Sequence, residues 1–241
     1  MSAPVPGTAL PIYVCSDVVA LQCFIGKRRL EKAIALKPEI AVKVYYQPYI
    51  VYPWVPRKGM SRAEFLTRGF GSFEKRHRKD EEEVVAAARA EGLLCNVDAI
   101  TRQPNTLDCN RLIRWAGESG NQAQMKQRLM ELFFTEGADL SDNEVLLAAA
   151  RDCAMDTKLI RRRLESEEDI AEVSADAEAC RDSGIDGVPC FILGGVYAIS
   201  GAQAPEVLAD AIARAAAAAG GHDLSLGARP RTRLRLVSYT P

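Results

Sequence analysis

Residues 12–46 read IYVCSDVVALQCFIGKRRLEKAIALKPEIAVKVYY, and this stretch decides the fold class. It opens with the apolar run Ile12–Cys15, which predicts a short buried strand. The amphipathic segment Gln22–Leu36 predicts a helix, which Pro38 ends. The β-branched and aromatic residues of Ala41–Tyr46 then predict a second strand. A strand, a helix and a strand in this compact order indicate a right-handed βαβ unit, and therefore an α/β fold.

The sheet is expected to resume near the other end of the chain. Val188–Leu193 is a further apolar run, Gly194–Gly195 predicts a tight hairpin turn, and Val196–Ile199 predicts the strand that pairs back. Pro205 stands at an allowed first-turn position of a last helix, and the alanine-rich segment Leu208–Ala219 continues this helix. The two ends of the chain therefore build one α/β unit.

The middle of the chain, from Ser61 to about Ser183, has helical periodicity almost throughout. Ser141 and Glu144 stand at capping-box spacing and predict the start of one helix. The other predicted helices are Lys79–Glu91, Leu107–Gly117, Gln122–Phe134 and Glu167–Arg181. We therefore expect three parts: an α/β domain formed by residues 1–58 and 184–221, an all-helical insertion domain over 59–183, and a basic C-terminal tail over 222–241.

Several motifs resemble those of one family. The segment Ser16–Glu31 (SDVVALQCFIGKRRLE) resembles the active-site segment of DsbA-like proteins of the FrnE type, whose relatives include 2-hydroxychromene-2-carboxylate isomerase and the kappa-class glutathione transferases. The other matching motifs, in the same order and spacing, are Asn105–Asp108, Arg111–Trp115, Phe134–Gly137, Gly187–Phe191 and Ser200–Gln203. The resemblance covers about residues 11–219 and implies a thioredoxin-like fold with a large all-helical insertion.

The resemblance also implies where the chemistry lies, and there the chain departs from the family. The oxidoreductase branch carries a C-x-x-C motif whose first cysteine, exposed at a helix N-terminus, is the attacking thiolate. This chain has Ala20 at that position and Cys23 at the position of the more buried resolving cysteine. An alanine cannot attack, so two-cysteine exchange through this motif is excluded. The isomerase and transferase branches use a serine at the position of Ala20, and Asn110 replaces a frequent family histidine.

The binding platform of the family is retained. Val188 and Pro189 match a cis-proline segment, which would turn the Val188 backbone toward an extended peptide or glutathione. Ser200, Gly201 and Ala202 match positions at which family members hold a γ-glutamyl or peptide carboxylate. The N-terminus of the first predicted helix adds unpaired N–H donors. Glutathione is the one small ligand that the resemblance suggests, and no other cofactor is expected.

The cysteines indicate the redox environment. No C-x-x-C pair occurs, and the chain has two histidines, so the spacing predicts no zinc site. We expect mostly free, buried thiols and a reducing compartment. Two interpretations of Cys23 stay open, a residual redox thiol and a buried small hydrophobe. Cys15 could lie near Cys23, whereas strand alternation turns Cys190 away from the face of Val188. The seven cysteines stand at positions 15, 23, 95, 109, 153, 180 and 190.

Charge and hydropathy exclude some classes of function. The chain has 31 Lys and Arg against 32 Asp and Glu, which argues against a general DNA- or RNA-binding protein because such proteins carry a basic surplus. No apolar run approaches the roughly 20 residues that span a bilayer. Met1–Leu10 has the features of neither a secretory signal nor a mitochondrial presequence. We therefore expect an intracellular protein, in the cytoplasm by default, with an organelle such as the mitochondrion left open.

The tail has its own pattern. Over Arg229–Val237 arginines alternate with other residues, which fits either an edge strand or a disordered basic arm. This segment could dock a partner or a neighbouring subunit, and the resemblance to the kappa class suggests a homodimer.

Two functions from different classes remain open. The first is a non-catalytic binding or assembly scaffold that keeps the cis-proline peptide platform, and the residues Ala20 and Asn110 favour it. The second is a divergent thiol-disulfide oxidoreductase, or a glutathione-dependent transferase or isomerase, that uses Cys23. The chemistry of the motif favours the first interpretation, whereas whole-domain similarity alone would favour the second.

Overall fold

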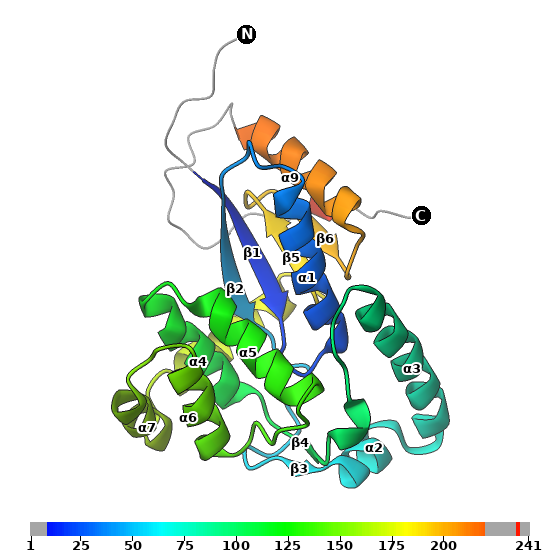
Figure 1. Cartoon of the computed structure of the whole chain (residues 1–241), viewed down its shortest axis with the longest axis vertical. Coiled ribbons are helices and arrows are strands. Elements are labelled where there is room, and N and C mark those ends of the chain that lie inside the picture. Colours follow the sequence, from blue (N-terminus) through cyan, green and yellow to red (C-terminus); the bar gives the residue numbers. More distant parts are fainter. Residues whose placement is uncertain (1–8, 220–234, 237–241) are drawn as a thin grey trace.

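The computed structural model describes residues 9–219 and 235–236. Within them the main sheet has the strand order β2-β1-β5-β6-β7 (Figure 1). β1 (Leu10–Ser16) runs parallel to β2 (Val42–Pro48) and antiparallel to β5 (Cys190–Leu193), which pairs in turn with β6 (Tyr197–Ser200). The predicted βαβ unit and the predicted hairpin therefore meet in one sheet, and the thioredoxin-like α/β fold class is confirmed.

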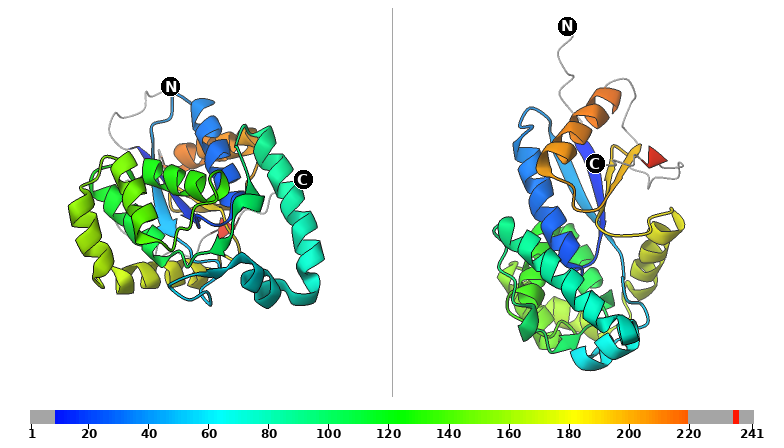
Figure 2. Two further views of the ribbon diagram at one scale, coloured as in Figure 1. Left: turned by 60° about the horizontal axis from the view of Figure 1, so that its bottom comes forward. Right: turned by 90° about the vertical axis from the view of Figure 1, so that its right-hand side faces the viewer.

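Helices cover both faces of this sheet. α1 (Leu21–Ala35) and α9 (Pro205–Ala219) lie on one face, and α8 (Ile170–Asp182) lies on the other (Figure 2). The alternation of side chains along β1 explains the two layers. Val14 belongs to the main hydrophobic core with α1, whereas the next residue, Cys15, belongs to a smaller cluster that includes Cys180 of α8.

The region between β2 and β5 is the large helical insertion. Two short strands, β3 (Met60–Ser61) and β4 (Arg102–Gln103), pair antiparallel within it, and 3-10 turns form at Gly71–Phe73 and Val97–Ala99. The insertion is therefore helical in the main but not throughout, and its domain boundaries at 59 and 183 stay a prediction. Before α8, its helices are α2 (Arg62–Phe70), α3 (Glu74–Ala90), α4 (Leu107–Glu118), α5 (Gln122–Phe134), α6 (Asn143–Asp152) and α7 (Thr157–Glu165).

α3 begins at Glu74, earlier than the predicted start at Lys79. The starts of α6 and α8 also differ from the prediction. The Asp142 side chain, rather than Ser141, caps α6 by accepting a hydrogen bond from the Glu144 N–H at 2.9 Å. Asp169 has a left-handed backbone with φ of 61°, so α8 begins at Ile170, later than the acidic run suggests. In both places neighbouring residues offer similar local signals, and the tertiary path of the chain selects one of them.

Arg111 explains one of the motifs in the insertion. Its side chain is fully buried and stacks on Trp115, with 4.9 Å between the guanidinium carbon and the ring centroid. The guanidinium donates to the backbone carbonyls of Arg163, Ser166 and Glu168 at 2.6 to 2.8 Å. These carbonyls lie where α7 ends and the chain turns into α8, so Arg111 holds this turn against α4.

Arg235–Leu236 forms β7, which runs parallel to β6, so these two residues of the predicted Arg229–Val237 segment are an edge strand. Residues 229–234 and 237 lie outside the described part.

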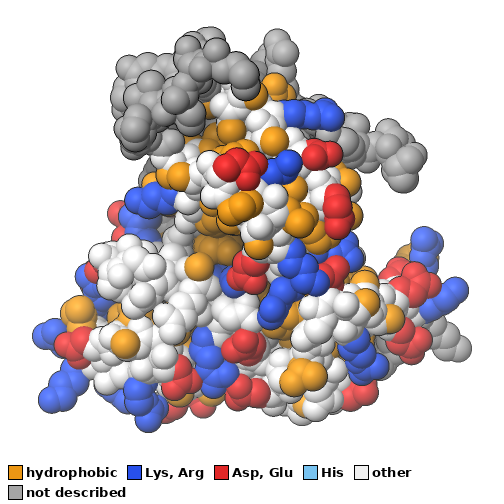
Figure 3. Space-filling view, turned by 45° about the horizontal axis from the view of Figure 1, so that its top comes forward, with side chains coloured by type: hydrophobic (Ala, Val, Ile, Leu, Met, Phe, Trp, Pro, Cys, Tyr) orange, Lys and Arg blue, Asp and Glu red, His pale blue; other side chains and the backbone are white. Residues whose placement is uncertain are grey.

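In the described chain, no helix has both the length and the apolar character that crossing a membrane requires. Basic and acidic side chains intermix over the face shown in Figure 3.

Candidate binding site beside the cis proline

A pocket of about 480 Å³ opens where the N-terminus of α1 meets the segment that leads into β5. Ala20–Gln22 forms one wall and Asp186–Val188 forms another. The remaining lining residues come from the turn after β1, from the connection after β2 and from the insertion: Val19, Tyr49, Val51, Tyr52, Arg62, Asp80, Glu81, Val84, Gln103 and Phe134. The pocket therefore lies between the sheet domain and the insertion.

Ala20 is the N-cap residue of α1. Its carbonyl accepts hydrogen bonds from the N–H groups of Cys23 at 2.8 Å and Phe24 at 3.4 Å, but its methyl group cannot cap the helix. The first turn of α1 contains no acidic residue. The positive end of the helix dipole therefore faces the pocket without a negatively charged side chain of its own turn.

The peptide bond between Val188 and Pro189 is cis. Val188 lines the pocket, and within the described residues neither its backbone N–H nor its carbonyl has a hydrogen-bond partner. Pro189 packs against Gly26 of α1 so closely that an added Cβ on Gly26 would lie 2.6 Å from Pro189 Cγ. The Gly201 N–H donates to the Pro189 carbonyl at 2.8 Å. Gly26 and Gly201 thus hold this segment in place, and sequence reasoning missed the role of Gly26.

Ser200, Gly201 and Ala202 lie behind Pro189, and none of them is among the residues that line the pocket. Ser200 is exposed at the end of β6, and the Ala202 carbonyl accepts a hydrogen bond from Arg29 Nη1 at 2.5 Å. The structure therefore gives Gly201 a positioning role for Pro189. A direct ligand contact by these three residues stays a prediction.

Cys23 points away from the pocket, into the core. Its side chain is 2% exposed, and it is not a lining residue. Burial raises the pKa of the Cys23 thiol to about 12. Cys23 therefore carries its proton at neutral pH, which is the behaviour of a buried structural cysteine.

Two buried charged residues, Asp17 and Lys126, lie near each other at the end of β1. The Asp17 carboxylate accepts hydrogen bonds from the Val18 N–H at 2.7 Å, the Val51 N–H at 2.8 Å and the Thr106 hydroxyl at 3.1 Å. Burial raises the pKa of Asp17, and the nearby Lys126 ammonium opposes this change. Burial likewise lowers the pKa of Lys126, opposed by Asp17. The hydrogen bond between Asp17 and Thr106 joins the end of β1 to the insertion.

Lys126 was not identified from the sequence. It lies in α5 between Met125 and Leu129, which are both buried, and it donates to the Ser16 carbonyl at 3.0 Å. A lysine on the apolar side of an otherwise amphipathic helix is the signal that would have found it.

Gln103 places an unused donor beside the pocket. Its side-chain oxygen accepts a hydrogen bond from Arg62 Nη1 at 3.0 Å, which fixes the orientation of the amide. Its Nε2 has no partner among the described residues, although Gln103 is only 1% exposed. Arg62 is held in turn by Glu81 at 2.6 Å. Because buried donors are normally paired, this free amide nitrogen on a residue of the pocket wall is exceptional.

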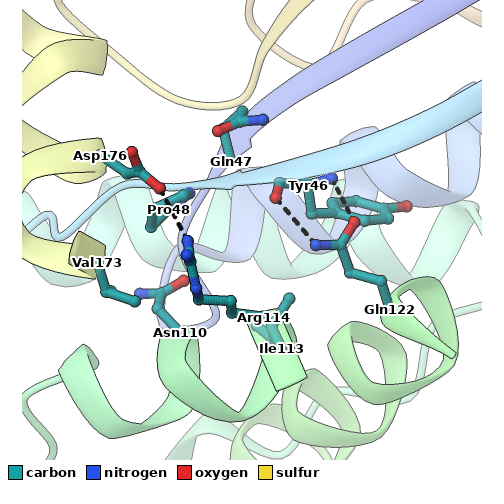
Figure 4. Close-up of a pocket in the computed structure, with 9 residues that line it drawn as sticks. All are labelled: Tyr46, Gln47, Pro48, Asn110, Ile113, Arg114, Gln122, Val173 and Asp176. Atoms are coloured by element: carbon teal, nitrogen blue, oxygen red, sulfur yellow. Dashed lines mark hydrogen bonds and ion pairs between the residues drawn. The ribbon is translucent and has the colours of Figure 1, made fainter. Parts of the chain in front are cut away.

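A second, smaller pocket of about 190 Å³ lies between β2, α4, α5 and α8 (Figure 4). Asn110 lines this second pocket and donates to the carbonyl at the start of α4 at 2.9 Å. Arg114 pairs with Asp176 at 3.3 Å, and the Gln122 amide bonds both backbone groups of Tyr46. The residue at the position of the family histidine therefore does not line the pocket beside Val188.

The remaining candidates concern metals and thiols. All seven cysteines are free and buried, as the sequence analysis predicted. Within the described ranges no group of His, Cys, Asp or Glu side chains could hold a metal ion. Cys15 lies in the cluster of α8 and Cys23 in the main core, so the structure does not bring this pair together as one cluster.

Comparison with solved structures agrees with this fold. A probable DsbA oxidoreductase from Streptomyces coelicolor has a TM-score of 0.79 and 27% identity, over 86% of this chain and 90% of its own. A 2-hydroxychromene-2-carboxylate isomerase has a TM-score of 0.64 and 13% identity, over 88% of this chain and 98% of its own. The cytosolic disulfide reductase DsbM from Pseudomonas aeruginosa, solved with glutathione, has a TM-score of 0.54 and 14% identity, over 76% and 85%.

The two latter similarities show the fold alone. No similar sequence was found among functionally curated proteins. The family model of the DSBA-like thioredoxin domain matches residues 12–213, which is most of the chain. This chain therefore belongs to the DSBA-like thioredoxin domain family.

Proposed function

We propose that this chain is a non-catalytic DsbA-like protein that binds an extended peptide segment of a partner protein in the pocket beside Val188. One observation carries the proposal. The methyl group of Ala20 stands at the N-cap position on the pocket wall, while the motif sulfur, that of Cys23, is buried with its pKa raised to about 12. Neither residue can present a thiolate to a ligand at neutral pH.

The polar groups around the pocket support peptide binding. The unpaired N–H and C=O of Val188 can pair with one residue of an extended chain, as in strand addition. The Gln103 Nε2 and the N-terminus of α1 are donors that suit a carbonyl or carboxylate oxygen. Glutathione is a tripeptide with the same groups, so it is the smallest ligand of this chemical class.

The proposal includes a reducing intracellular compartment. Proteins that work in oxidising compartments rely on disulfides, and cysteines in reducing compartments stay as thiols. All seven cysteines of this chain are free and buried, which supports that location.

The catalytic half of the proposal is tested with disulfide-reductase and glutathione-transfer assays. We expect no turnover by the wild-type protein. Ala20→Cys should gain turnover, because it returns a thiol to an uncapped helix N-terminus, where thiol pKa values fall to about 3.5–7.5. Ala20→Ser is the matched control of similar size in the disulfide-reductase assay, because a hydroxyl does not exchange with a disulfide. Turnover by the wild type that Cys23→Ser abolishes would refute the proposal in favour of the oxidoreductase interpretation.

The binding half is tested by titrating the wild-type protein with reduced glutathione, S-methylglutathione and an array of unstructured peptides, followed by NMR. Gln103→Glu keeps the acceptor for Arg62 but replaces the free donor by an oxygen. We expect this variant to bind carboxylate-bearing ligands about tenfold more weakly, the loss of roughly one hydrogen bond. A wild-type protein that binds neither glutathione nor any peptide contradicts the proposal.

A further inference from the structure

Three cysteines gather on the sheet face opposite α1. Cys15 of β1, Cys190 of β5 and Cys180 of α8 belong to one small hydrophobic cluster, together with Tyr49 and Ile185. Cys15 and Cys190 are direct partners in the antiparallel pair of β1 and β5, so their side chains point to the same face. This cluster is separate from the motif that contains Ala20.

Two of the thiols are in contact. The sulfur atoms of Cys15 and Cys180 lie 2.8 Å apart, although the two residues are 165 positions apart in the sequence. A disulfide bond needs about 2.05 Å between the sulfurs, so a shift of less than one ångström would join them. The last turn of α8 and the end of β1 therefore present a preformed dithiol.

The two thiols differ in reactivity. Either thiol can donate the hydrogen bond between them. This contact lowers the pKa of Cys180 and raises that of Cys15. Cys180 is also the more accessible of the two, at 9% exposed against 0% for Cys15. Cys180 is thus the thiol that a small oxidant reaches first, with Cys15 placed to resolve the product.

We propose that Cys15 and Cys180 form an intramolecular disulfide when the protein meets a hydroperoxide. The Cys180 thiolate attacks one oxygen of hydrogen peroxide, which gives a sulfenic acid and releases hydroxide. The sulfur of Cys15 then attacks the Cys180 sulfur, the S–S bond forms, and the leaving hydroxyl takes the Cys15 proton as water. In total two thiols lose two electrons and two protons, and one peroxide becomes two water molecules.

The position of this bond links it to the pocket. Cys180 lies just before the segment that carries Asp186–Val188, one wall of the pocket. Tyr49, which also lines the pocket, donates a hydrogen bond to the Ile185 carbonyl at 3.4 Å within the same cluster. A Cys15–Cys180 bond therefore fixes the segment before the pocket wall to β1.

Peptide mapping of the full-length native protein tests the proposal. The protein is treated with one equivalent of hydrogen peroxide, and free thiols are blocked with N-ethylmaleimide during denaturation. Trypsin cleaves after Arg181 and thereby separates Cys180 from Cys190. A second protease, which cleaves before aspartate, cuts before Asp17 and separates Cys15 from Cys23. We expect a linked Cys15–Cys180 peptide, lighter by two hydrogens than its parts, in most molecules.

Two variants sharpen the result. Cys190→Ser should still form the linked peptide, because Cys190 is a bystander, whereas Cys180→Ser should not. Seven blocked thiols in the treated wild type, a terminal sulfinic acid at Cys180, or a Cys15–Cys190 link would each overturn the proposal. Because the wild-type map alone decides between these outcomes, the test does not depend on the folding of a variant.

Discussion

The substitution Gly26→Ala tests whether the contact between α1 and Pro189 shapes the pocket. An added Cβ at residue 26 would lie 2.6 Å from Pro189 Cγ and 3.2 Å from Phe191 Cζ. Both partners are ring atoms of buried side chains, so neither can swing aside as the end of a long flexible side chain would. Either α1 or the start of β5 must move.

Two opposing effects set the magnitude. Alanine in a helix interior is favoured over glycine by about 0.8–1.0 kcal/mol. Overpacking a core costs about 1–3 kcal/mol, and a contact of 2.6 Å belongs at the upper end of that range. The net loss in the free energy of unfolding is therefore about 2 kcal/mol. For a chain of this size that lowers the melting temperature by about 4–8 °C.

Gly117→Ala in α4 is the matched control. Its Cβ would meet nothing nearer than Gln122 Nε2 at 3.6 Å, an ordinary contact. We expect this variant to gain about 0.5–1 kcal/mol from helix propensity. Thermal and urea unfolding of both variants, with a glutathione titration of each, measure the difference. If Gly26→Ala stabilises the protein as much as Gly117→Ala does, the argument from close packing is refuted.

Three further predictions follow from other parts of the molecule. Arg111→Ala should lower the free energy of unfolding by about 3–5 kcal/mol, because it leaves buried carbonyls without a partner. Arg114→Ala, at a more exposed ion pair, should change the free energy of unfolding by at most about 1 kcal/mol. Equal losses for the two variants in urea unfolding would contradict this prediction. The Cys15–Cys180 bond should stabilise the oxidised protein by up to about 5 kcal/mol, since the bond closes a loop across 165 positions; a melting temperature that dithiothreitol does not change would count against it. Hydrogen bonds from Lys32 and Arg29 of α1 lower the pKa of Glu91. The contribution of Glu91 to the free energy of unfolding is therefore present above its unfolded pKa of about 4.3 and is lost as the pH falls through its folded pKa. The stability difference between wild type and Glu91→Gln should therefore be largest near neutral pH and disappear in acid, and a difference that is constant with pH would show that the ion pair is not its origin.

The fold could be predicted where its signals are local. The βαβ unit follows from two apolar runs and one amphipathic segment, and α5 has the predicted bounds Gln122–Phe134. Prediction failed where adjacent residues carry equivalent signals, as Ser141 and Asp142 do for the cap of α6. Asp169 adopts a left-handed backbone, which no local pattern indicates for an aspartate that precedes a helical run.

The site could be predicted only as far as its motifs reach. The motifs indicated Ala20 and Val188, and both residues line the pocket. Gln103 and Lys126 were not found, because each looks like an ordinary polar residue until distant segments bury it. The contact between Cys15 and Cys180 could likewise not be predicted from the sequence. Strand alternation predicts on which face of the sheet Cys15 lies, but not which helix covers that face.

The carboxylate of Asp17 has a consequence for protein engineering. It accepts hydrogen bonds from Val51, before the insertion begins, and from Thr106, inside it, while the nearby charge of Lys126 in α5 partly offsets the effect of burial on its pKa. Excising residues 59–183, or grafting this region from another family member, would leave a charged group stranded at the end of β1. A chimera would therefore need Thr106 and Lys126 in its insertion, or a neutral residue in place of Asp17 in its sheet domain. The insertion and the sheet domain therefore cannot be exchanged independently of each other.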